Sequence, residues 1–490
     1  MYRFLPPFFR KKPKPEKLTA PPLTIRNLTS VPIDLKVIER YNAPGDNGPL
    51  IAISRFAGNI TSFTNNFTES AGFKLPTGPS SRGLEENAQS FNHEEVDIRV
   101  DPFTTIHTDK HATERESNEV LRLTFEADRQ RYRIDTPLAV SYTRVLIPLV
   151  LDPKYTFTAV FVAGETYLTI FSSANLDGWM NELADYVPIS SLSIPGTHNS
   201  STCHKALPSV RCQAVSPREQ LNNGVRFLDI RVQPEKPGDA GHDGLILVHG
   251  VFPISLTGNK YFRGLTNDVM LFLEEHPSET VIISVKREGP GEHTDQQLSK
   301  ILHDHYTNNK RWYTDPRIPK LGEARGKITL MRRFALDDSI KGDHNGRGYA
   351  IDAENWAYNT PNDRHGDVIV QDFCEVLETK NIEVKTNYVT EHLERAGCLQ
   401  CPEGDAPPPP LHLNFLSASN FWRMGCWPEK IAARLNPAVV NHLAAKHIMG
   451  GEGDWGTGVV VCDWVGEGGD WDLVRCVVGM NGKVLMKHGR

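Results

Sequence analysis

Two histidines stand where apolar, strand-like runs of this sequence end. His198 closes the run SLSIPGTH and His249 closes the run LILVH, while Asp229 and Arg231 lie in the run RFLDIRV between them. An imidazole titrates near neutral pH, so one histidine can accept a proton while the other donates one. A guanidinium matches the geometry of a phosphate and neutralises its charge. Together these residue types suit the cleavage of a phosphodiester.

Charged residues also follow later apolar runs, at Lys286, Arg333, Asp372 and Asp463. Each of them, taken alone, is explained more simply by a surface position or a salt bridge. Their repeated position at the same end of successive runs favours one shared site instead. A carboxylate behind a histidine fixes the tautomer and stabilises the imidazolium, and Asp463 is the candidate for that role.

The elements that would position these residues are eight apolar runs between residues 185 and 490, separated by longer, partly helical segments. Nearly continuous apolar strands that alternate with helices are typical of a parallel sheet covered on both faces. We therefore predict an α/β fold, a TIM-like (β/α)8 barrel that is distorted or incomplete, with its chemistry at the C-terminal strand ends. The runs are SLSIPGTH, RFLDIRV, LILVHG, TVIISVKRE, GKITLMRRF, DVIVQDF, LHLNFLSAS and GVVVCDWVG.

Two of the intervening segments carry apolar residues at helical spacing. They are LTNDVMLFLEEHP, residues 265–277, and NPAVVNHLAAKHI, residues 436–448. In the second, Asn436 before Pro437 predicts an N-cap followed by proline at the first helical position. The segment CLQCPEGDAPPPP, residues 398–410, contains a CxxC pair without a second pair to complete a zinc site, so we expect an exposed loop.

The first third of the chain has a different pattern. Residues 21–172 contain short β-like runs separated by turns, among them LTIRN, IDLKVIERY, VLRLTFEA, YTFTAVFV and YLTIF. Alternation in VLRLTFEA buries one face, so we predict an all-β, sandwich-like N-terminal domain. Residues 1–20 would form a flexible, basic, Pro-rich tail, and residues 185–490 the barrel.

Charge and hydropathy restrict the possible partners and compartment. A formal net charge of -6 provides no general attraction for nucleic acid. The sequence contains no run of about 18 apolar residues that would suggest a membrane span, and its first residues lack the pattern of a signal peptide. The eight cysteines are sparse, as in proteins with reduced thiols. We expect a cytoplasmic protein or one peripheral at membranes; the oligomeric state stays open.

The ordered series SIPGTHNSS, GVRFLDIRV, LILVHG and TVIISVKREG resembles the X region of phosphatidylinositol-specific phospholipase C, in particular the bacterial type. The resemblance spans roughly residues 185–480 and implies an incomplete TIM-like barrel that binds an inositol headgroup at its mouth. It implies His198 as general base on the inositol 2-hydroxyl and His249 as general acid on the diacylglycerol oxygen. Arg231 would hold the phosphate and Asp463 would orient the base.

The same resemblance places Lys286, Arg333 and Asp372 among the inositol and phosphate contacts. In the calcium-using branch of the family, acidic ligands occupy the positions of Arg231 and Lys286, so the resemblance implies a reaction without metal or other cofactor. Asn199 departs from the bacterial pattern, in which an aspartate follows the first histidine and supports the acid.

Three explanations of that departure stay open: Asp229 compensates for the missing charge, the acid step is slower, or the substrate is a different one.

The expected activity is that of a phosphatidylinositol diacylglycerol-lyase, which yields diacylglycerol and inositol 1,2-cyclic phosphate at a membrane surface. One alternative is a phosphodiesterase that acts on another lipid or on a glycerophosphodiester. Another is a weakly active protein that binds phosphoinositide headgroups.

Overall fold

The computed structural model describes residues 21–42, 84, 88–112, 119–136, 143–162, 166–172, 175–207, 209–404, 406–448 and 451–489. The predicted basic tail, residues 1–20, lies outside these ranges. Among the described residues, no helix combines the length and the apolar character that crossing a membrane requires.

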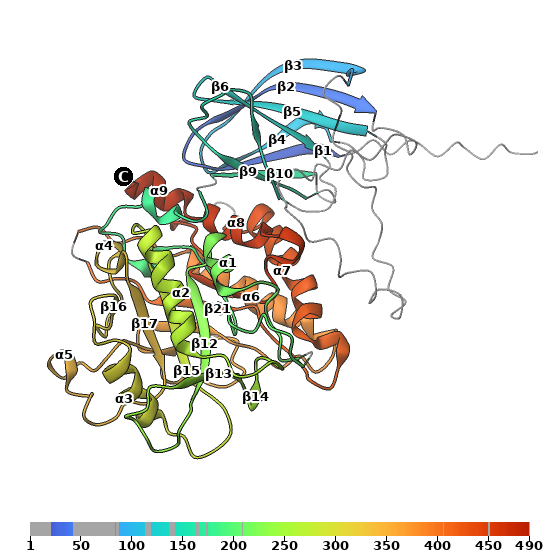
Figure 1. The fold of residues 1–490 in the computed structure, drawn as a ribbon. Helices are drawn as coiled ribbons and strands as arrows, with labels where there is room; N and C mark the ends of the chain where they lie inside the picture. The colour runs from blue at the N-terminus through green and yellow to red at the C-terminus, as the bar shows by residue number, and fades with distance from the viewer. Residues whose placement is uncertain are drawn as a thin grey trace, which may run out of the picture.

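Residues 22–172 contain two five-stranded sheets, with the orders β4-β1-β10-β9-β7 and β3-β2-β5-β6-β8. Buried side chains of both sheets, such as Leu23, Leu35 and Phe125, belong to one hydrophobic cluster. The strand pair β9 and β10 lies next to α7 and α8 (Figure 1). The domain boundary at residue 172 stays a prediction. The strands are β1 (Pro22–Leu28), β2 (Ile33–Asn42), β3 (Asn92–Val100), β4 (Thr104–His111), β5 (Glu119–Ala127), β6 (Gln130–Thr136), β7 (Thr143–Val145), β8 (Ile147–Pro148), β9 (Phe157–Val162) and β10 (Tyr167–Ser172).

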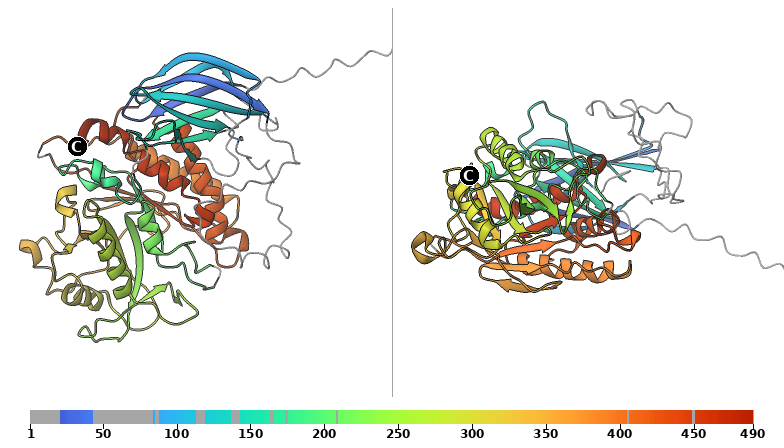
Figure 2. Two further views of the ribbon diagram at one scale, coloured as in Figure 1. Left: turned by 45° about the horizontal axis from the view of Figure 1, so that its top comes forward. Right: turned by 60° about the horizontal axis from the view of Figure 1, so that its bottom comes forward.

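Later residues form a mixed α/β unit around a curled sheet (Figure 2). The strands of this sheet follow the order β16-β17-β15-β12-β11-β22-β21-β20-β19. Neighbours along this path are parallel, apart from β19 and β20. The strands are β11 (Ile194–Thr197), β12 (Phe227–Pro234), β13 (Leu245–His249), β14 (Phe252–Pro253), β15 (Val281–Arg287), β16 (Trp312–Tyr313), β17 (Ile328–Arg333), β18 (Ile351–Asp352), β19 (Asp363–His365), β20 (Val368–Gln371), β21 (Leu411–Phe415) and β22 (Val459–Cys462).

The expectation of eight parallel strands is wrong for the third run. β13 pairs antiparallel with β12, because only residues 235–244 connect them and a parallel crossover needs about a dozen residues or more. Within the described residues, no ladder joins β19 or β20 to β16, β17 or β18. The sheet is therefore curled but open, which agrees with the incomplete form of the predicted barrel.

Helices cover this sheet. The two predicted helical segments overlap α2 and α7 and extend two and three residues beyond their C-terminal ends. The predicted start of the second one is wrong, because α7 begins at Pro428 and contains Pro437 in its interior. Asn436 is not a cap; its side-chain amide donates to the Asp463 carbonyl at 2.9 Å. The helices are α1 (Pro217–Asn222), α2 (Phe262–Glu275), α3 (Asp295–His305), α4 (Leu321–Ala324), α5 (Asp343–Gly346), α6 (Asn381–Gly397), α7 (Pro428–Ala445), α8 (Asp472–Gly479) and α9 (Gly482–His488), with short 3-10 turns at Trp179–Glu182, Ile189–Ser191, Met424–Cys426 and Glu467–Gly469.

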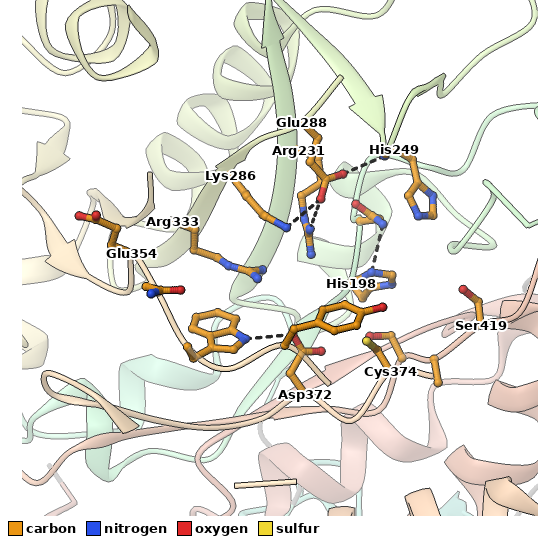
Figure 3. A pocket seen from close by; sticks show the side chains of 17 residues that line it. His198, Arg231, His249, Lys286, Glu288, Arg333, Glu354, Asp372, Cys374 and Ser419 are labelled. Carbon is orange, nitrogen blue, oxygen red and sulfur yellow. Dashed lines mark hydrogen bonds and ion pairs between the residues drawn. The ribbon is translucent and has the colours of Figure 1, made fainter. Parts of the chain in front are cut away.

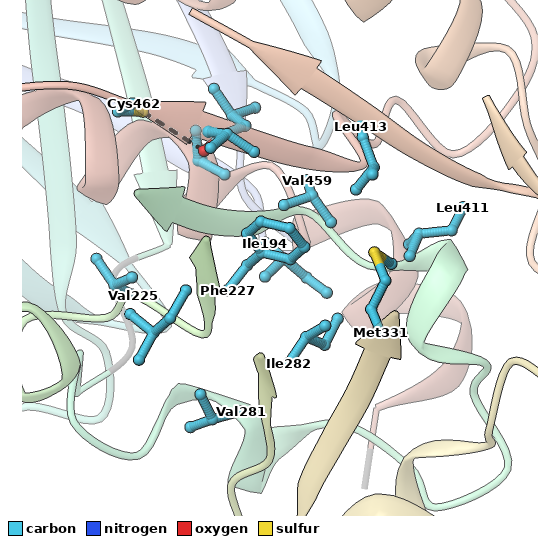
Figure 4. Close-up of a cluster of buried hydrophobic side chains, with 14 of the residues drawn as sticks. Ile194, Val225, Phe227, Val281, Ile282, Met331, Leu411, Leu413, Val459 and Cys462 are labelled. Carbon is cyan, nitrogen blue, oxygen red and sulfur yellow. Dashed lines mark hydrogen bonds between the residues drawn. The ribbon is translucent and has the colours of Figure 1, made fainter. Parts of the chain in front are cut away.

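The core beneath the strand ends is closely packed around β11 (Figure 4). Ile194, Phe227 and Val459 are fully buried or nearly so. A Cβ atom on Gly196 would lie 3.0 Å from Phe227 and 3.2 Å from Val459, so the Pro-Gly pair lets β11 approach both neighbouring strands. This packing fixes the backbone immediately before His198.

Candidate active site

A cavity of about 470 Å³ opens at the carboxyl ends of the central strands (Figure 3). All predicted site residues except Asp229 and Asp463 line it, and these two lie behind the lining. The lining residues are His198, Asn199, Arg231, His249, Gly250, Lys286, Glu288, Arg333, Glu354, Asn355, Trp356, Tyr358, Asp372, Cys374, Ser417, Ala418 and Ser419.

His198 and Asp463 meet because their strands are paired. The last residues of β11 and β22, Thr197 and Cys462, are partners in a parallel register. Nδ1 of His198 donates to Oδ1 of the buried Asp463 at 2.9 Å. Burial disfavours the charged ring, but the Asp463 carboxylate raises the pKa of His198 well above its ordinary value. With Nδ1 occupied, Nε2 is the nitrogen that can accept a proton.

Asn199 occupies the free side of the same ring. Its Nδ2 lies 3.0 Å from Nε2 of His198, and its Oδ1 is buried without a hydrogen-bond partner. The backbone of Asn199 has a φ of 42° and its N–H donates to Asp229 at 3.2 Å. A substrate hydroxyl that donates to Nε2 would have to displace the Asn199 amide from this position.

His249 faces His198 across the site. Their ring centroids are 6.0 Å apart with the rings perpendicular. Nδ1 of His249 donates to the Val210 carbonyl at 2.8 Å, which leaves Nε2 for a substrate. Burial opposes a charge on this ring, but the nearby Cys212 raises the pKa of His249. The Cys212 sulfur lies 3.9 Å from Nδ1 of His249.

Arg231 is held between two carboxylates. Its Nη2 donates to Asp229 at 2.8 Å and its Nη1 donates to Glu288 at 2.5 Å. Burial opposes ionisation of Asp229, yet Arg231 and then Arg333 lower its pKa to about 2. Asp229 is thus committed to arginines and to the backbone of Asn199, and within the described residues it makes no hydrogen bond to His249. Compensation by Asp229 was one of the open explanations for Asn199, but the group that accepts from Nδ1 of His249 is the Val210 carbonyl.

Three cations stand side by side on adjacent strands. Arg231 of β12 is in register with Lys286 of β15, which is in register with Arg333 of β17. Burial and then Arg231 lower the pKa of Arg333 to about 10, so the guanidinium stays charged at neutral pH. The same causes lower the pKa of Lys286. A row of cations that destabilise one another suits a bound anion.

Aromatic and acidic groups complete the far side of the cavity. The Arg333 guanidinium lies 4.0 Å from the centre of the Trp356 ring, and the indole N–H of Trp356 donates to Asp372 at 3.1 Å. Asp372, predicted as an inositol contact, therefore lines the cavity with one oxygen already bonded.

Sequence reasoning missed Glu288, Trp356, Tyr358 and Cys212. Glu288 had a signal, since it lies two residues after Lys286 and strand alternation places both on the same side. Trp356 and Tyr358 come from the segment between β18 and β19, whose position no local pattern reveals. Cys212 lies in a loop after β11, and only the fold brings its thiol to His249.

Two groups of three side chains among the described residues could ligate a metal ion. One is His198, Cys212 and Asp463, and the other is Glu394, His442 and His447. The first consists of the site's own imidazole and carboxylate with a thiol, a donor set that calcium does not favour. Arg231, Lys286 and Arg333 form the cation row of the cavity. The buried Asp229 and the partly buried Glu288 are both already paired with Arg231.

Comparison with known proteins agrees with this geometry. Residues 186–334 match the family described as phosphatidylinositol-specific phospholipase C, X domain. The chain is 28% identical over 294 residues to 1-phosphatidylinositol phosphodiesterase of Listeria monocytogenes, covering 57% of this chain and 80% of the relative. It is 25% identical over 312 residues to the Staphylococcus aureus enzyme of the same name, covering 60% and 90%.

Solved structures show the same fold. A structure of phosphatidylinositol-specific phospholipase C from S. aureus superposes with a TM-score of 0.50 at 22% identity, covering 63% of this chain and 98% of that one.

Proposed function

We propose, from the premise that the chain belongs to the phosphatidylinositol-specific phospholipase C X-domain family, that it cleaves phosphatidylinositol to diacylglycerol and inositol 1,2-cyclic phosphate. One observation carries the proposal: the hydrogen-bonded pair His198 and Asp463 faces His249 across a cavity that also presents Arg231, Lys286 and Arg333. The premise supports phosphodiesterase chemistry on this lipid class, and the site supplies a base, an acid and an anion-binding row.

The first step is attack by the inositol 2-hydroxyl on phosphorus. Nε2 of His198 takes the hydroxyl proton while the oxygen forms a bond to phosphorus, and Asp463 stabilises the resulting imidazolium through Nδ1–H. The Asn199 amide yields its place at Nε2 to the hydroxyl. Because the nucleophile belongs to the substrate, no water is needed and the product is a cyclic phosphodiester.

Departure of diacylglycerol requires a proton on its oxygen. His249 in its charged form donates that proton from Nε2, while the Val210 carbonyl keeps Nδ1–H in place. The bond from phosphorus to the glycerol oxygen breaks with the electron pair on that oxygen. His198 ends charged and His249 neutral, so a proton must return between turnovers.

Arg231 holds the charge that grows on the non-bridging oxygens. Asp229 and Glu288 fix its guanidinium from two sides, so the donors are oriented before the substrate arrives. Lys286 and Arg333 extend the same row toward the inositol ring, where Asp372 can accept from ring hydroxyls.

Arg231→Lys is expected to lower kcat by roughly 10²-fold or more, because an ammonium keeps the charge and loses the planar fork. Steady-state kinetics on phosphatidylinositol vesicles measure the effect, with Arg287→Lys as the control. Arg287 neighbours Lys286 on β15 but does not line the cavity, and its Nε donates to Asp295 at 2.6 Å. Equal activity of Arg231→Lys and the native protein would contradict the assigned role.

We also propose that apolar side chains beside the cavity contact the membrane. Val251 and Phe252 follow the lining residue Gly250, and Phe421 and Trp422 follow the lining residue Ser419. Phe252 and Phe421 stack with their ring centroids 6.0 Å apart, and Trp422 is 87% exposed. Indole rings favour the interface between lipid and water, so this apolar rim would seat the cavity over a headgroup.

Trp422→Ala is expected to weaken binding to phosphatidylinositol vesicles by about 10-fold through lost apolar burial, with activity on a water-soluble inositol phosphodiester unchanged. Vesicle sedimentation and a soluble-substrate assay separate the two effects. Leu151→Ala is the matched control, since Leu151 is fully exposed in the region of the N-terminal sheets. If both variants bind vesicles like the native protein, the rim is not the membrane contact.

A substrate panel tests the proposed function itself. We expect cleavage of phosphatidylinositol and no release of phosphocholine from phosphatidylcholine, sphingomyelin or glycerophosphocholine, since a choline headgroup has no free hydroxyl that could attack the phosphorus. Cleavage of any of the latter would favour the alternative of a phosphodiesterase that uses water.

A further inference from the structure

A second group of metal-ligand side chains lies outside the active site, where α6 meets the end of α7. Oε1 of Glu394 lies 2.8 Å from Nε2 of His442 and 2.9 Å from Nδ1 of His447. The three ligand atoms are all within 4.8 Å of one another. Glu394 projects from α6, His442 from the last turn of α7, and His447 from the segment just after α7. Three side chains from separate turns thus converge on one point.

We propose that Glu394, His442 and His447 bind one zinc ion, with water as the fourth ligand. Two imidazole nitrogens and one carboxylate oxygen are donors that zinc favours, whereas calcium and magnesium favour sites built from oxygen alone. A tetrahedral zinc with bonds of about 2.0–2.1 Å holds its ligand atoms about 3.4 Å apart. Each nitrogen therefore has to move away from Oε1 by only about half an ångström.

The neighbours of these side chains also fit a bound ion. Nε2 of His447 lies 3.1 Å from the Trp455 carbonyl, and because a carbonyl only accepts, Nε2 carries the hydrogen and Nδ1 can offer its lone pair. The other Glu394 oxygen accepts from the Ile448 N–H at 3.1 Å. Metal-bound histidines and carboxylates are typically oriented by such outer hydrogen bonds.

Access and charge are compatible with an ion. The side chain of His447 is fully buried, while those of His442 and Glu394 are 15% and 38% exposed, so solvent can reach the open side of the site. Arg26 places a positive charge nearby, which opposes the binding of a cation, since its guanidinium donates to the His447 carbonyl at 2.6 Å. The Glu394 carboxylate offsets that charge.

The position of Arg26 also indicates what the ion would do. Arg26 belongs to β1, and it donates to the carbonyls of both Ala444 and His447. An ion bound to His442 and His447 would fix the turn that presents these acceptors. The site would therefore be structural, joining α6 to α7 and stabilising the contact between the end of α7 and β1.

The test is titration of the purified, chelator-treated full chain with zinc chloride, measured by calorimetry and by thermal unfolding. We expect one zinc ion to bind tightly per chain, which is one tight equivalent, and we expect Tm to rise with zinc. His442→Ala should weaken that equivalent by at least about 100-fold, beyond the cost of losing an outer partner, and should remove the Tm rise. The matched control is His242→Ala, because His242 contacts a single carboxylate, Glu235, at 2.7 Å. This variant should leave both zinc binding and the zinc-dependent rise in Tm unchanged.

Two results would overturn the proposal. One is the absence of a tight equivalent in the native chain, which would leave the group as a hydrogen-bonded network. The other is a tight equivalent that survives His442→Ala and disappears in His198→Ala, which would place zinc in the active site. Should His442→Ala fail to fold by circular dichroism, Glu394→Gln replaces it, because the amide oxygen still accepts from Ile448 while the charged ligand is gone.

Discussion

Replacing His198 by alanine is expected to lower kcat for phosphatidylinositol cleavage by roughly 10⁴-fold, with binding to phosphatidylinositol vesicles largely retained. In the proposed reaction this imidazole accepts the 2-hydroxyl proton, and general base catalysis contributes up to about 10⁴-fold. The cation row and the apolar rim do not involve this ring, so lipid binding should persist. Product release from radiolabelled lipid and vesicle sedimentation measure the two properties.

The same variant separates the enzyme from the headgroup-binding alternative. His204→Ala is the control, because His204 lies in the loop that follows His198 but does not line the cavity. Cleavage that is unchanged in His198→Ala would contradict the assignment of the base. A native chain that binds the lipid without cleaving it would favour a binding protein.

Asp463→Asn is expected to lower kcat by about 10³-fold or more while the fold is kept. The asparagine amide can donate to Nδ1 of His198, which forces the ring hydrogen onto Nε2 and removes the lone pair that accepts the substrate proton; exchange of this kind in a Ser-His-Asp triad costs about 10⁴-fold. Circular dichroism and steady-state kinetics check the prediction. Activity within a few-fold of native would show that Asp463 does not orient the base.

The pH profile gives an independent readout of the same contact. His198 must be neutral to act as base, and Asp463 raises the pKa of His198. The acidic limb of the kcat/KM profile is therefore expected at a pH above the ordinary pKa of a histidine. Removing the charge lowers that pKa, and the limb of the residual activity in Asp463→Asn should move to lower pH. A limb that stays in place or moves to higher pH would contradict the contribution of Asp463.

Much of the site was predictable because the apolar runs of the sequence indicate both the strands and the residues at which the strands end. Apolar runs with a charged residue at one end predicted that His198, Arg231, Lys286 and Arg333 would share a cavity, and parallel register brings them together. The curled α/β sheet followed from the same runs. The count of eight apolar runs did not reveal whether the barrel closes. A short connection makes β13 antiparallel, and among the described residues the ends of the sheet stay unpaired.

What could not be predicted depends on contacts between segments distant in sequence. Val210 and Cys212 reach His249 from the loop after β11, and Trp356 covers Arg333 from a segment without regular structure. The explanation in which Asp229 compensates for Asn199, one of three left open, depended on charge alone, whereas the position of Asp229 on β12 directs its carboxylate to Arg231 and Arg333. The zinc-ligand group was equally hidden, since Glu394 and His447 are brought together only by the packing of α6 against α7.

The most direct test of the proposed reaction is phosphorus NMR of the products formed from phosphatidylinositol vesicles, first with a chelator of divalent ions and then with added calcium. The proposed reaction predicts the signal of a five-membered cyclic phosphodiester in the chelator at the rate seen with calcium, because Arg231 and its neighbours supply the positive charge. A cyclic product only with calcium would contradict the role of the cation row. An acyclic inositol phosphate formed without a cyclic precursor would contradict attack by the 2-hydroxyl.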